Sequence, residues 1–324
     1  TILSRLEPAA AEDGTVDPGR EARLADARAR LLARRETRPQ PARDDKALAA
    51  WNGLAIAAFA DGARLLPGPD GDRYGAAAIE AATAILAGLR RWDGRLGRSW
   101  KDGRSSGEGV LEDYADLADG LLALYEATFD ERWFATAREL ADTILSRFAD
   151  PAGGFFDTAD DHETLVTRPK DPQDNATPAG GSMATLVLLR LAALTGDDRY
   201  RAAAERALAS VGSFLGRYPT GFANWLSAGE LAVNGIVELG IVGEPGDDGT
   251  QALLDAARST RRADLVVAVA ADPDRSAIPL LHHRHAIDGK PTAYVCRGFA
   301  CRLPVTDAAA LVAELSPSTG STLA

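Results

Sequence analysis

The feature that most restricts the fold of this sequence is an internal repeat of paired helical segments. Three segments begin alike, at residues 72–74, 130–133 and 198–200, and their leading aromatic residues lie 59 and 67 positions apart. An apolar segment precedes each of them, over about 46–66, 110–127 and 176–195. The unit is therefore two helices in roughly 60 residues, which is the length of a helical repeat.

The two helices of each unit differ in polarity. The first is apolar nearly all round, which is typical of a buried helix, and the second carries charges on one face. Inner apolar helices alternating with outer amphipathic ones predict a mainly α fold, an (α/α) toroid of helical hairpins. A simple solenoid would show the same pattern. Three hairpins and the start of a fourth, at 224–239, are too few for a closed six-hairpin ring, so we expect an incomplete toroid.

The two ends of the sequence have a different texture. Residues 1–43 are polar and Arg-rich, with a helix expected at 20–36 and a linker after it. The toroid part is expected at 44–239. Beyond it, the pattern of a strand at 239–242, a helix at 250–259 and apolar strands at 265–269 and 293–296 predicts a βαβ unit. We expect residues 240–324 to form a small α/β segment that closes with a helix at 307–315 and packs on the toroid.

Charge and composition exclude several classes of function. The net charge of −11 argues against binding to nucleic acid or to an anionic membrane surface. No apolar run is long enough to span a bilayer. No P-loop or dinucleotide-binding glycine pattern appears, so no cofactor is predicted. These observations predict a cytoplasmic protein.

The loops that lead into the apolar helices carry the residues suited to chemistry. Because inner helices of a toroid run roughly parallel, we expect these loops to meet at one mouth. Carboxylates, amides and aromatic rings around one pocket are typical of sugar binding. The candidates are Asp44, Asp45, Lys46, Trp51 and Asn52 in the first loop, Glu112, Asp113 and Tyr114 in the second, Lys170, Asp171, Asp174 and Thr177 in the third, and Trp225 in the fourth.

Within this set, Asp45 and Glu112 are predicted to divide acid and base roles. Asp113 is the third catalytic candidate, but adjacent residues of a helix cannot face the same way, so only one of Glu112 and Asp113 is expected to point into the pocket. Trp51, Tyr114 and Trp225 are predicted stacking platforms, and the remaining candidates are predicted to bind substrate. The alternative is that the acids only cap helices.

The histidines and cysteines give weaker indications of chemistry than these loops do. A His-x-His pair at 283 and 285 could bind metal, but no carboxylate lies at matching spacing, so no metal site is predicted. Cys296 and Cys301 match neither a thioredoxin motif nor a zinc ribbon. They are either two buried thiols on a strand and turn, or a redox-sensitive pair that exchanges with a partner dithiol.

Six strings carry a family resemblance, in this order: RDDKALAAWNGLAIAAFA, GVLEDYADLADGLLALYEAT, GGFFDTADD, RPKDPQDNATPAGGSMA, LTGDDRY and PTAYVCRGFACRLPVTD. Together they resemble the YyaL/spermatogenesis-associated protein 20 family. The resemblance implies a six-hairpin glycosidase-like barrel, similar in shape to N-acylglucosamine 2-epimerases and cellobiose epimerases. It also implies a thioredoxin-like domain in the full-length protein, which this chain would lack together with the first hairpins.

Two functions follow as expectations. The first is a carbohydrate-active domain, a sugar hydrolase or an epimerase/isomerase, that acts on or binds a sugar in the central funnel. The related epimerases use histidines as acid and base, and the toroid part of this sequence has none in the right loops. Either the missing part of the full-length protein supplies them, or carboxylates do this work, or there is no chemistry. The second is a non-catalytic, redox-linked scaffold for the thioredoxin-like domain. A third possibility is a domain that binds a sugar without any chemistry.

Overall fold

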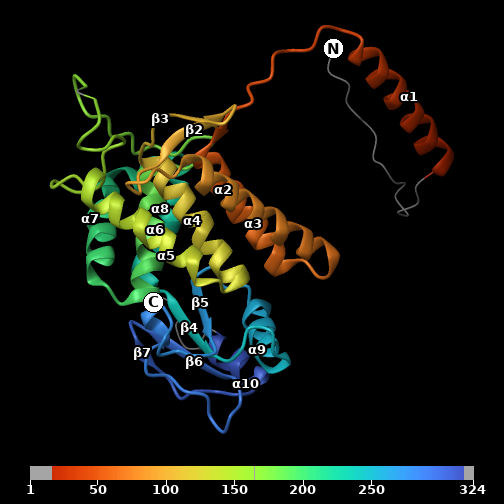
Figure 1. Ribbon diagram of the computed structural model, residues 1–324. Coiled ribbons are helices and arrows are strands. Elements are labelled where there is room, and N and C mark those ends of the chain that lie inside the picture. The colour runs from red at the N-terminus through yellow and green to blue at the C-terminus, as the bar shows by residue number, and fades with distance from the viewer. Residues whose placement is uncertain (1–16, 164, 317–324) are drawn as a thin grey trace. The chain divides into compact units, whose positions relative to one another are not determined.

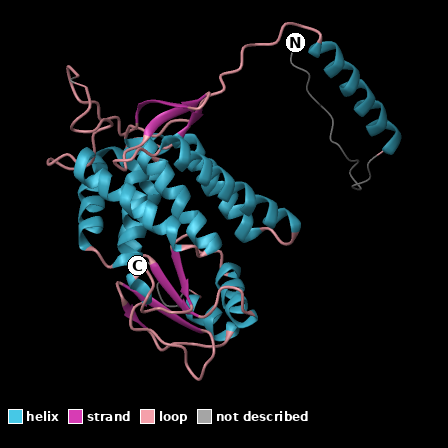
Figure 2. Ribbon diagram, viewed as in Figure 1, coloured by secondary structure: helices cyan, strands magenta, loops and turns pink. Residues whose placement is uncertain are grey.

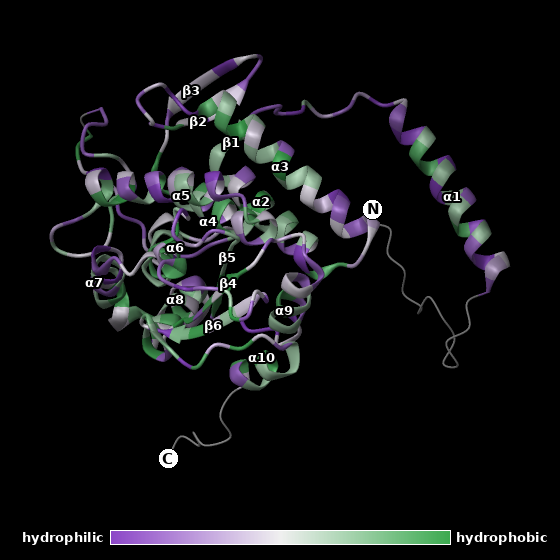
Figure 3. Ribbon diagram, turned by 60° about the horizontal axis from the view of Figure 1, so that its bottom comes forward, coloured by the Kyte–Doolittle hydropathy of each residue, from purple (hydrophilic) through white to green (hydrophobic). Residues whose placement is uncertain are grey.

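The computed structural model describes residues 17–163 and 165–316, and it divides the chain into two units after Asp45. In the described part of the first unit, helix α1 (Pro18–Glu36) ends at the predicted residue and begins two residues before the predicted start. Asp17 caps it by accepting a hydrogen bond from the amide of Gly19 at 2.8 Å, and Pro18 suits the first turn. Polar and apolar residues alternate along α1 in Figure 3, and it has no buried residue.

The second unit contains the helical hairpins (Figures 1 and 2). Its elements up to the C-terminal sheet are β1 (Ala47–Leu48), α2 (Ala49–Leu65), α3 (Pro69–Leu89), β2 (Gly97–Lys101), β3 (Arg104–Glu108), α4 (Leu111–Thr128), α5 (Glu131–Thr143), a π-helical turn (Ile144–Phe148), α6 (Gly180–Thr195), α7 (Asp198–Leu215), a 3-10 turn (Pro219–Gly221) and α8 (Ala223–Asn234). Helices α2, α4, α6 and α8 pack in sequence, and α3, α5 and α7 each cover the helix before them. This two-layer order confirms the predicted incomplete (α/α) toroid.

Helix α4 is the centre of this core. From Leu111 to Glu126 every residue except Glu112 is buried. Its contact with α2 depends on two glycines. A Cβ on Gly53 would lie 2.3 Å from the carbonyl carbon of Asp116, and a Cβ on Gly120 would lie 2.4 Å from the carbonyl oxygen of Gly53. The backbones of the two helices therefore touch directly.

A small antiparallel sheet, in the order β1-β2-β3, was not expected from the sequence. The residues of 97–108 are mostly polar, so no apolar alternation marks these strands in the sequence, and in the structure β3 is exposed throughout. The sequence did hold a hairpin signal. Asp102 and Gly103 have φ values of 50° and 76°, as a two-residue type I′ turn requires.

The C-terminal part of this unit is a four-stranded sheet in the order β5-β4-β6-β7. Its elements are β4 (Val237–Val242), α9 (Asp248–Ser259), β5 (Leu265–Ala270), a 3-10 turn (Pro279–Leu281), β6 (Thr292–Arg297), β7 (Ala300–Cys301) and α10 (Ala308–Leu315). Strands β4 and β5 are parallel with α9 between them, which confirms the predicted βαβ unit. Side chains alternate across the sheet: Val267 and Val269 pack in a core with α9 and α10, whereas Val266 and Ala268 join the core of the hairpin helices.

One predicted boundary is wrong. The fourth inner helix was expected to continue to Leu239, but α8 ends at Asn234. Gly235, with φ of 75°, breaks the helix, and the chain then enters β4, every residue of which is buried. Pairing with both β5 and β6 stabilises residues 237–239 as a strand, although their apolar character alone also suits a buried helix.

Candidate functional site

A hollow of about 390 Å³ lies where the first turns of α4 and α6 meet the loops before them. It is lined by Arg98, Val110, Glu112, Asp157, Thr158, Pro169, Asp171, Gln173, Asn175, Thr177, Pro178, Ala179 and Gly180. Three of these residues are acids and one is a base. Of the residues predicted from the sequence, the hollow therefore brings together Glu112, Asp171 and Thr177.

Glu112 is the residue of the first two turns of α4 that faces the hollow. Arg98, on β2, donates from Nη2 to Oε1 of Glu112 at 2.8 Å, and from Nη1 to the buried Asp113 at 3.2 Å. The guanidinium therefore fixes the position of the Glu112 carboxylate. The neighbouring acids thus point in different directions, as their adjacency on a helix requires.

Asp157 is the acid that sequence reasoning missed. Burial raises its pKa, and the negative charges of Asp171 and Glu112 raise it further. The amide of Asp171 donates to Oδ2 of Asp157 at 3.0 Å, which acts in the opposite direction. The available signal was the position of Asp157 after the glycine-rich Gly-Gly-Phe-Phe turn, a segment that carried the family resemblance.

Thr158, next to Asp157, adds a polar group to the wall. The residue is 7% exposed, and its hydroxyl has no hydrogen-bond partner among residues 17–163 and 165–316. A buried hydroxyl normally has a partner, because leaving one unmade costs about 1–3 kcal/mol. The hydroxyl oxygen is itself buried, so it lies within the wall and is not exposed to a ligand in the hollow.

Two of the predicted site acids are buried helix caps. Asp113 accepts hydrogen bonds from the amides of Val110 and Ala50 at 3.0 and 3.1 Å, and burial raises its pKa to about 6. Asp174 accepts from the amides of Ala179 and Asn224 at 2.9 and 3.0 Å. These bonds tie α4 to α2 and α6 to α8. Neither residue lines the hollow.

The proposed stacking roles of Tyr114 and Trp225 do not fit the structure. Tyr114 is completely buried, with its ring 5.2 Å from that of Phe148 and its hydroxyl accepting from the amide of Leu96 at 2.9 Å. Trp225 is 2% exposed, and its indole nitrogen donates to the carbonyl of Pro172 at 2.8 Å. Both rings are core residues, because the hairpin helices close over the first turns on which they lie.

The remaining predicted residues lie outside the lining of the hollow. Trp51 is 64% exposed at the start of α2, Asn52 donates to the carbonyl of Leu48 at 2.8 Å, and Lys46 is exposed. Lys170 is 2.9 Å from Asp150 and also bonds the Gly153 carbonyl.

Asp44 and Asp45 belong to the N-terminal unit, where Asp45 accepts a hydrogen bond from Arg43. Their predicted approach to Glu112 stays a prediction.

A second set of charges is buried along one face of α4, beyond the hollow. Nη1 of Arg190, on α6, is 2.8 Å from Oδ1 of Asp119. Nη2 of Arg190 is 3.4 Å from Oε1 of Glu126. Glu126 in turn is 2.8 Å from Arg64 of α2. Asp116 has no such partner, and burial raises its pKa to about 8, with Glu112, Asp119 and Asp113 adding to the effect. This network holds the inner helices together at the ends remote from the hollow.

Within the described ranges, no three His, Cys, Asp or Glu side chains are arranged to hold a metal ion. No helix in these ranges is long and apolar enough to cross a membrane. The cytoplasmic location predicted from the sequence stays a prediction.

The cysteines are not the two thiols of the first interpretation. Cys296 and Cys301 face each other across β6 and β7 and form a disulfide. A separation of five positions around a two-residue turn places two residues opposite each other on a hairpin, and this spacing was the signal in the sequence.

Comparison with known proteins finds matches of three kinds. Residues 117–227, from α4 to α8, match the family model of glycosyl hydrolase family 47. The solved structure of cellobiose 2-epimerase from Spirochaeta thermophila aligns with a TM-score of 0.42 at 19% identity, over 51% of this chain and 43% of that chain.

Two curated relatives match most of the chain. Spermatogenesis-associated protein 20 of Homo sapiens is 32% identical over 308 residues, which cover 89% of this chain and 38% of the human protein. The Mus musculus protein of the same name is 31% identical over 299 residues, covering 86% and 37%. The chain thus spans less than two fifths of the length of these relatives. On this evidence it belongs to the spermatogenesis-associated protein 20 family.

Proposed function

We propose that the hollow at the first turns of α4 and α6 binds a carbohydrate, and that Glu112 and Asp157 carry out acid/base chemistry on it. The observation that carries this proposal is the presence of two carboxyl groups with unlike surroundings in one hollow. Asp157 is half-buried with a raised pKa, whereas Glu112 is partly exposed and paired with Arg98. Unlike environments let two carboxyl groups divide the acid and base roles.

The roles follow from these environments. A carboxyl group with a raised pKa keeps its proton longer, so Asp157 is the proposed proton donor to a ring or glycosidic oxygen. Glu112, held by Arg98, is the proposed base. Asp171 and Gln173, which line the hollow, would bind sugar hydroxyls. The same pair could serve a hydrolase or an epimerase/isomerase.

The lining of the hollow offers polar groups and two proline rings to a sugar. No aromatic ring of the described residues lines it, so the stacking predicted from the sequence does not support binding. Pro169 and Pro178 offer apolar faces to the C–H groups of a sugar ring. Selectivity would therefore come mainly from polar groups aimed at hydroxyls, as in pockets with few but fixed polar contacts.

The test is a panel of mono- and disaccharides against the wild-type chain, Glu112→Gln and Asp157→Asn, with Asp160→Asn as the matched control. Asp160 is an exposed acid of the same loop, 3.3 Å from Arg147. A sugar that binds should raise the melting temperature of all four proteins in a saturable way. Turnover should fall by about 10²-fold or more in the two site variants only.

Three results would decide the matter. Turnover that survives in both site variants contradicts the catalytic roles. A stabilising sugar without turnover in the wild-type chain reduces the site to a binding function. If no sugar of the panel shifts the melting temperature or is converted, the proposal fails. The thioredoxin-like domain as a partner in the full-length protein remains a separate prediction.

A further inference from the structure

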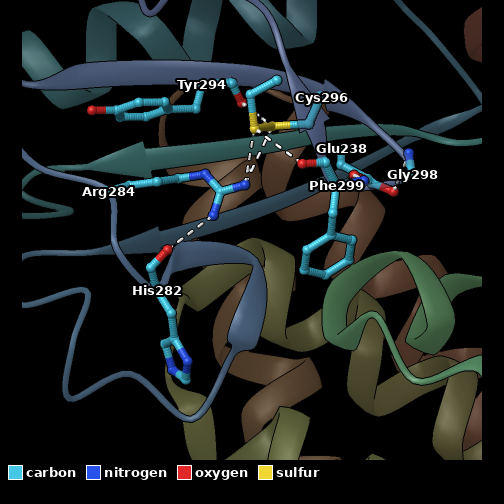
Figure 4. The surroundings of a disulfide bond; sticks show 8 residues. Glu238, His282, Arg284, Tyr294, Cys296, Gly298 and Phe299 are labelled. Carbon is cyan, nitrogen blue, oxygen red and sulfur yellow. Dashed lines mark hydrogen bonds between the residues drawn. A yellow bond between two sulfur atoms is a disulfide. The ribbon is translucent and has the colours of Figure 1, made fainter.

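The disulfide between Cys296 and Cys301 lies beside a buried arginine. Arg284, between the 3-10 turn and β6, is 9% exposed. Its Nη2 atom is 3.0 Å from Sγ of Cys301 and 3.4 Å from Sγ of Cys296, so the guanidinium points at both sulfurs (Figure 4). The pair was predicted as a redox candidate from the sequence, but the arginine was not part of that prediction.

Among the residues that the structure describes, Arg284 has no counterion. Its Nη1 atom donates to the carbonyl of His282 at 3.2 Å, and its Nε atom has no hydrogen-bond partner in that part of the chain. Among the ion pairs of the described ranges, none includes Arg284. Burial lowers its pKa, with Glu238 and Tyr294 opposing that effect from a distance. A buried cation is normally paired, because an uncompensated charge is costly.

A disulfide is neutral and cannot balance this charge, whereas a thiolate can. An adjacent cation lowers the pKa of a thiol and stabilises the thiolate as a leaving group. We propose that Cys296 and Cys301 form a thiol–disulfide exchange site for a protein or small molecule that carries a dithiol, with Arg284 as the residue that stabilises the thiolate.

The two sulfurs differ in access, which sets the direction of attack. Cys301 is exposed on β7, whereas Cys296 is 1% exposed on β6. A thiolate of the dithiol therefore attacks Sγ of Cys301, the disulfide bond breaks, and Cys296 leaves as a thiolate beside Arg284. The second thiol of the dithiol loses its proton to solvent. The resulting thiolate attacks the first sulfur of the same dithiol, which is bonded to Cys301 in the mixed disulfide. Cys301 is released and takes up a proton, so the dithiol is oxidised and the cysteine pair is reduced by two electrons.

The hairpin keeps the sulfurs opposite each other when they are reduced. Gly298 and Phe299 form a two-residue turn in which both residues have positive φ. The buried Glu238, on β4, accepts hydrogen bonds from both turn amides at 3.0 and 2.8 Å (Figure 4). The turn is thus fixed by contacts that do not involve sulfur, and reoxidation should need little rearrangement.

The first experiment measures the fraction of the reduced pair at set ratios of reduced to oxidised dithiothreitol, by alkylation and mass spectrometry. The variant is Arg284→Met, and the control is Arg297→Met, which removes a guanidinium of β6 that bonds the carbonyl of Asn234 instead of sulfur. At a pH of about 10, above the pKa of the thiol, Arg284→Met should need about a tenfold higher ratio for half reduction, which corresponds to a rise of about one unit in the pKa of the thiol. The control should match the wild type. Equal midpoints for all three proteins would overturn the role of Arg284.

The second experiment covers the case that Arg284→Met does not fold. In Cys301→Ser, which keeps Arg284, the rate of alkylation of Cys296 by iodoacetamide is followed against pH. An apparent pKa below the ordinary value of about 8.5 is expected, and an ordinary or raised value would overturn the proposal. Glu238 and Tyr294 also face Arg284, and Arg201 of α7 acts on Glu238. Repeating the profile in Cys301→Ser with Glu238→Gln separates the titration of Glu238 from that of the thiol.

The third experiment tests the direction of attack. Cys301 alone, in Cys296→Ser, should react with an aromatic disulfide reagent at least tenfold faster than Cys296 alone in Cys301→Ser. The reverse order of rates would contradict the assignment of Cys301 as the attacked sulfur.

Discussion

Leu111 donates its amide hydrogen to the carbonyl oxygen of Asp157 at 2.8 Å. The bond joins the first residue of α4 to a loop nearly fifty positions later in the chain. It places the side chain of Asp157 beside the first turn that carries Glu112, and a second bond, from the amide of Asp157 to the carbonyl of Pro169, adds the loop that carries Asp171. The three acids of the hollow are therefore brought together by backbone hydrogen bonds.

The contact between α2 and α4 predicts that Gly53→Ala is strongly destabilising. The added Cβ would lie 2.3–2.5 Å from backbone atoms of Asp116 and Leu117, which cannot move without separating the helices. We expect a loss of about 3 kcal/mol or more in the free energy of unfolding, at the upper end of overpacking effects. Denaturant titration measures it.

Gly212→Ala is the matched control, because Gly212 lies within α7 and a Cβ there meets nothing within 4 Å. It should be neutral or stabilise the chain by about 0.5–1 kcal/mol through helix propensity. Equal effects of the two substitutions would contradict the direct backbone contact.

Because the carboxyl group of Asp116 is buried, we expect the free energy of unfolding to fall as pH rises. Burial raises the pKa of Asp116 in the folded state from the ordinary value of 3.8 to about 8, so the folded state keeps a proton that the unfolded state has already lost. The free energy of unfolding should therefore decrease from about pH 4 to pH 8 and level off above that. Asp113, with a pKa raised to about 6, adds to the decrease between pH 4 and 6.

In Asp116→Asn the side chain resembles the protonated acid. The variant should be more stable than the wild type by up to a few kcal/mol at pH 8, and the two should agree near pH 4. Thermal unfolding across this pH range measures the difference. Asp255→Asn, a change at an exposed acid of α9, is the control. A wild-type pH profile that survives unchanged in Asp116→Asn would show that Asp116 is not the group responsible.

How much of this molecule could be predicted depends on what kind of signal each part carries. The inner helices and the βαβ unit follow from apolar periodicity, which is written in consecutive residues. Glu112 was identified because it opens such a helix. Asp157 was not, because it lies in a loop without periodicity and reaches the site only through the hydrogen bonds from Leu111 and to Pro169.

The stacking predictions for Tyr114 and Trp225 failed for a related reason. A ring in the first turn of a helix can face a pocket or a neighbouring helix, and the sequence does not say which. Tyr114 and Trp225 both face neighbours. For the disulfide, in contrast, the sequence holds enough information. Once the turn at 298–299 is identified, the spacing of Cys296 and Cys301 places them opposite each other on a hairpin.

Trp225→Phe tests the structural role of that ring. Phenylalanine would keep most of the packing but would lose the hydrogen bond to the carbonyl of Pro172. We expect a loss of about 1–2 kcal/mol in the free energy of unfolding, and unchanged affinity for any sugar that binds in the hollow. Calorimetric titration of such a sugar is the measurement. A large loss of affinity at unchanged stability would restore Trp225 as a stacking platform.

Arg190→Met addresses the buried charges of α4. Arg190 is the partner of Asp119 and also lies near Glu126, and all three are buried or nearly so. Removing it leaves Asp119 without a partner in the core, and breaking a buried pair in this way costs about 3–5 kcal/mol. Arg206→Met, at an exposed position of α7, should cost less than about 0.5 kcal/mol.

The double variant Arg190→Met with Asp119→Leu separates the pair from the cost of an unpaired charge. Replacing both partners by apolar residues of similar size should restore much of the stability lost in Arg190→Met, because the desolvation of two ions is then avoided. Glu126 would keep Arg64 at 2.8 Å in this variant. If the double variant were as unstable as the single one, the ion pair would be a net source of stability. Its attraction would then exceed the cost of removing the two charges from water.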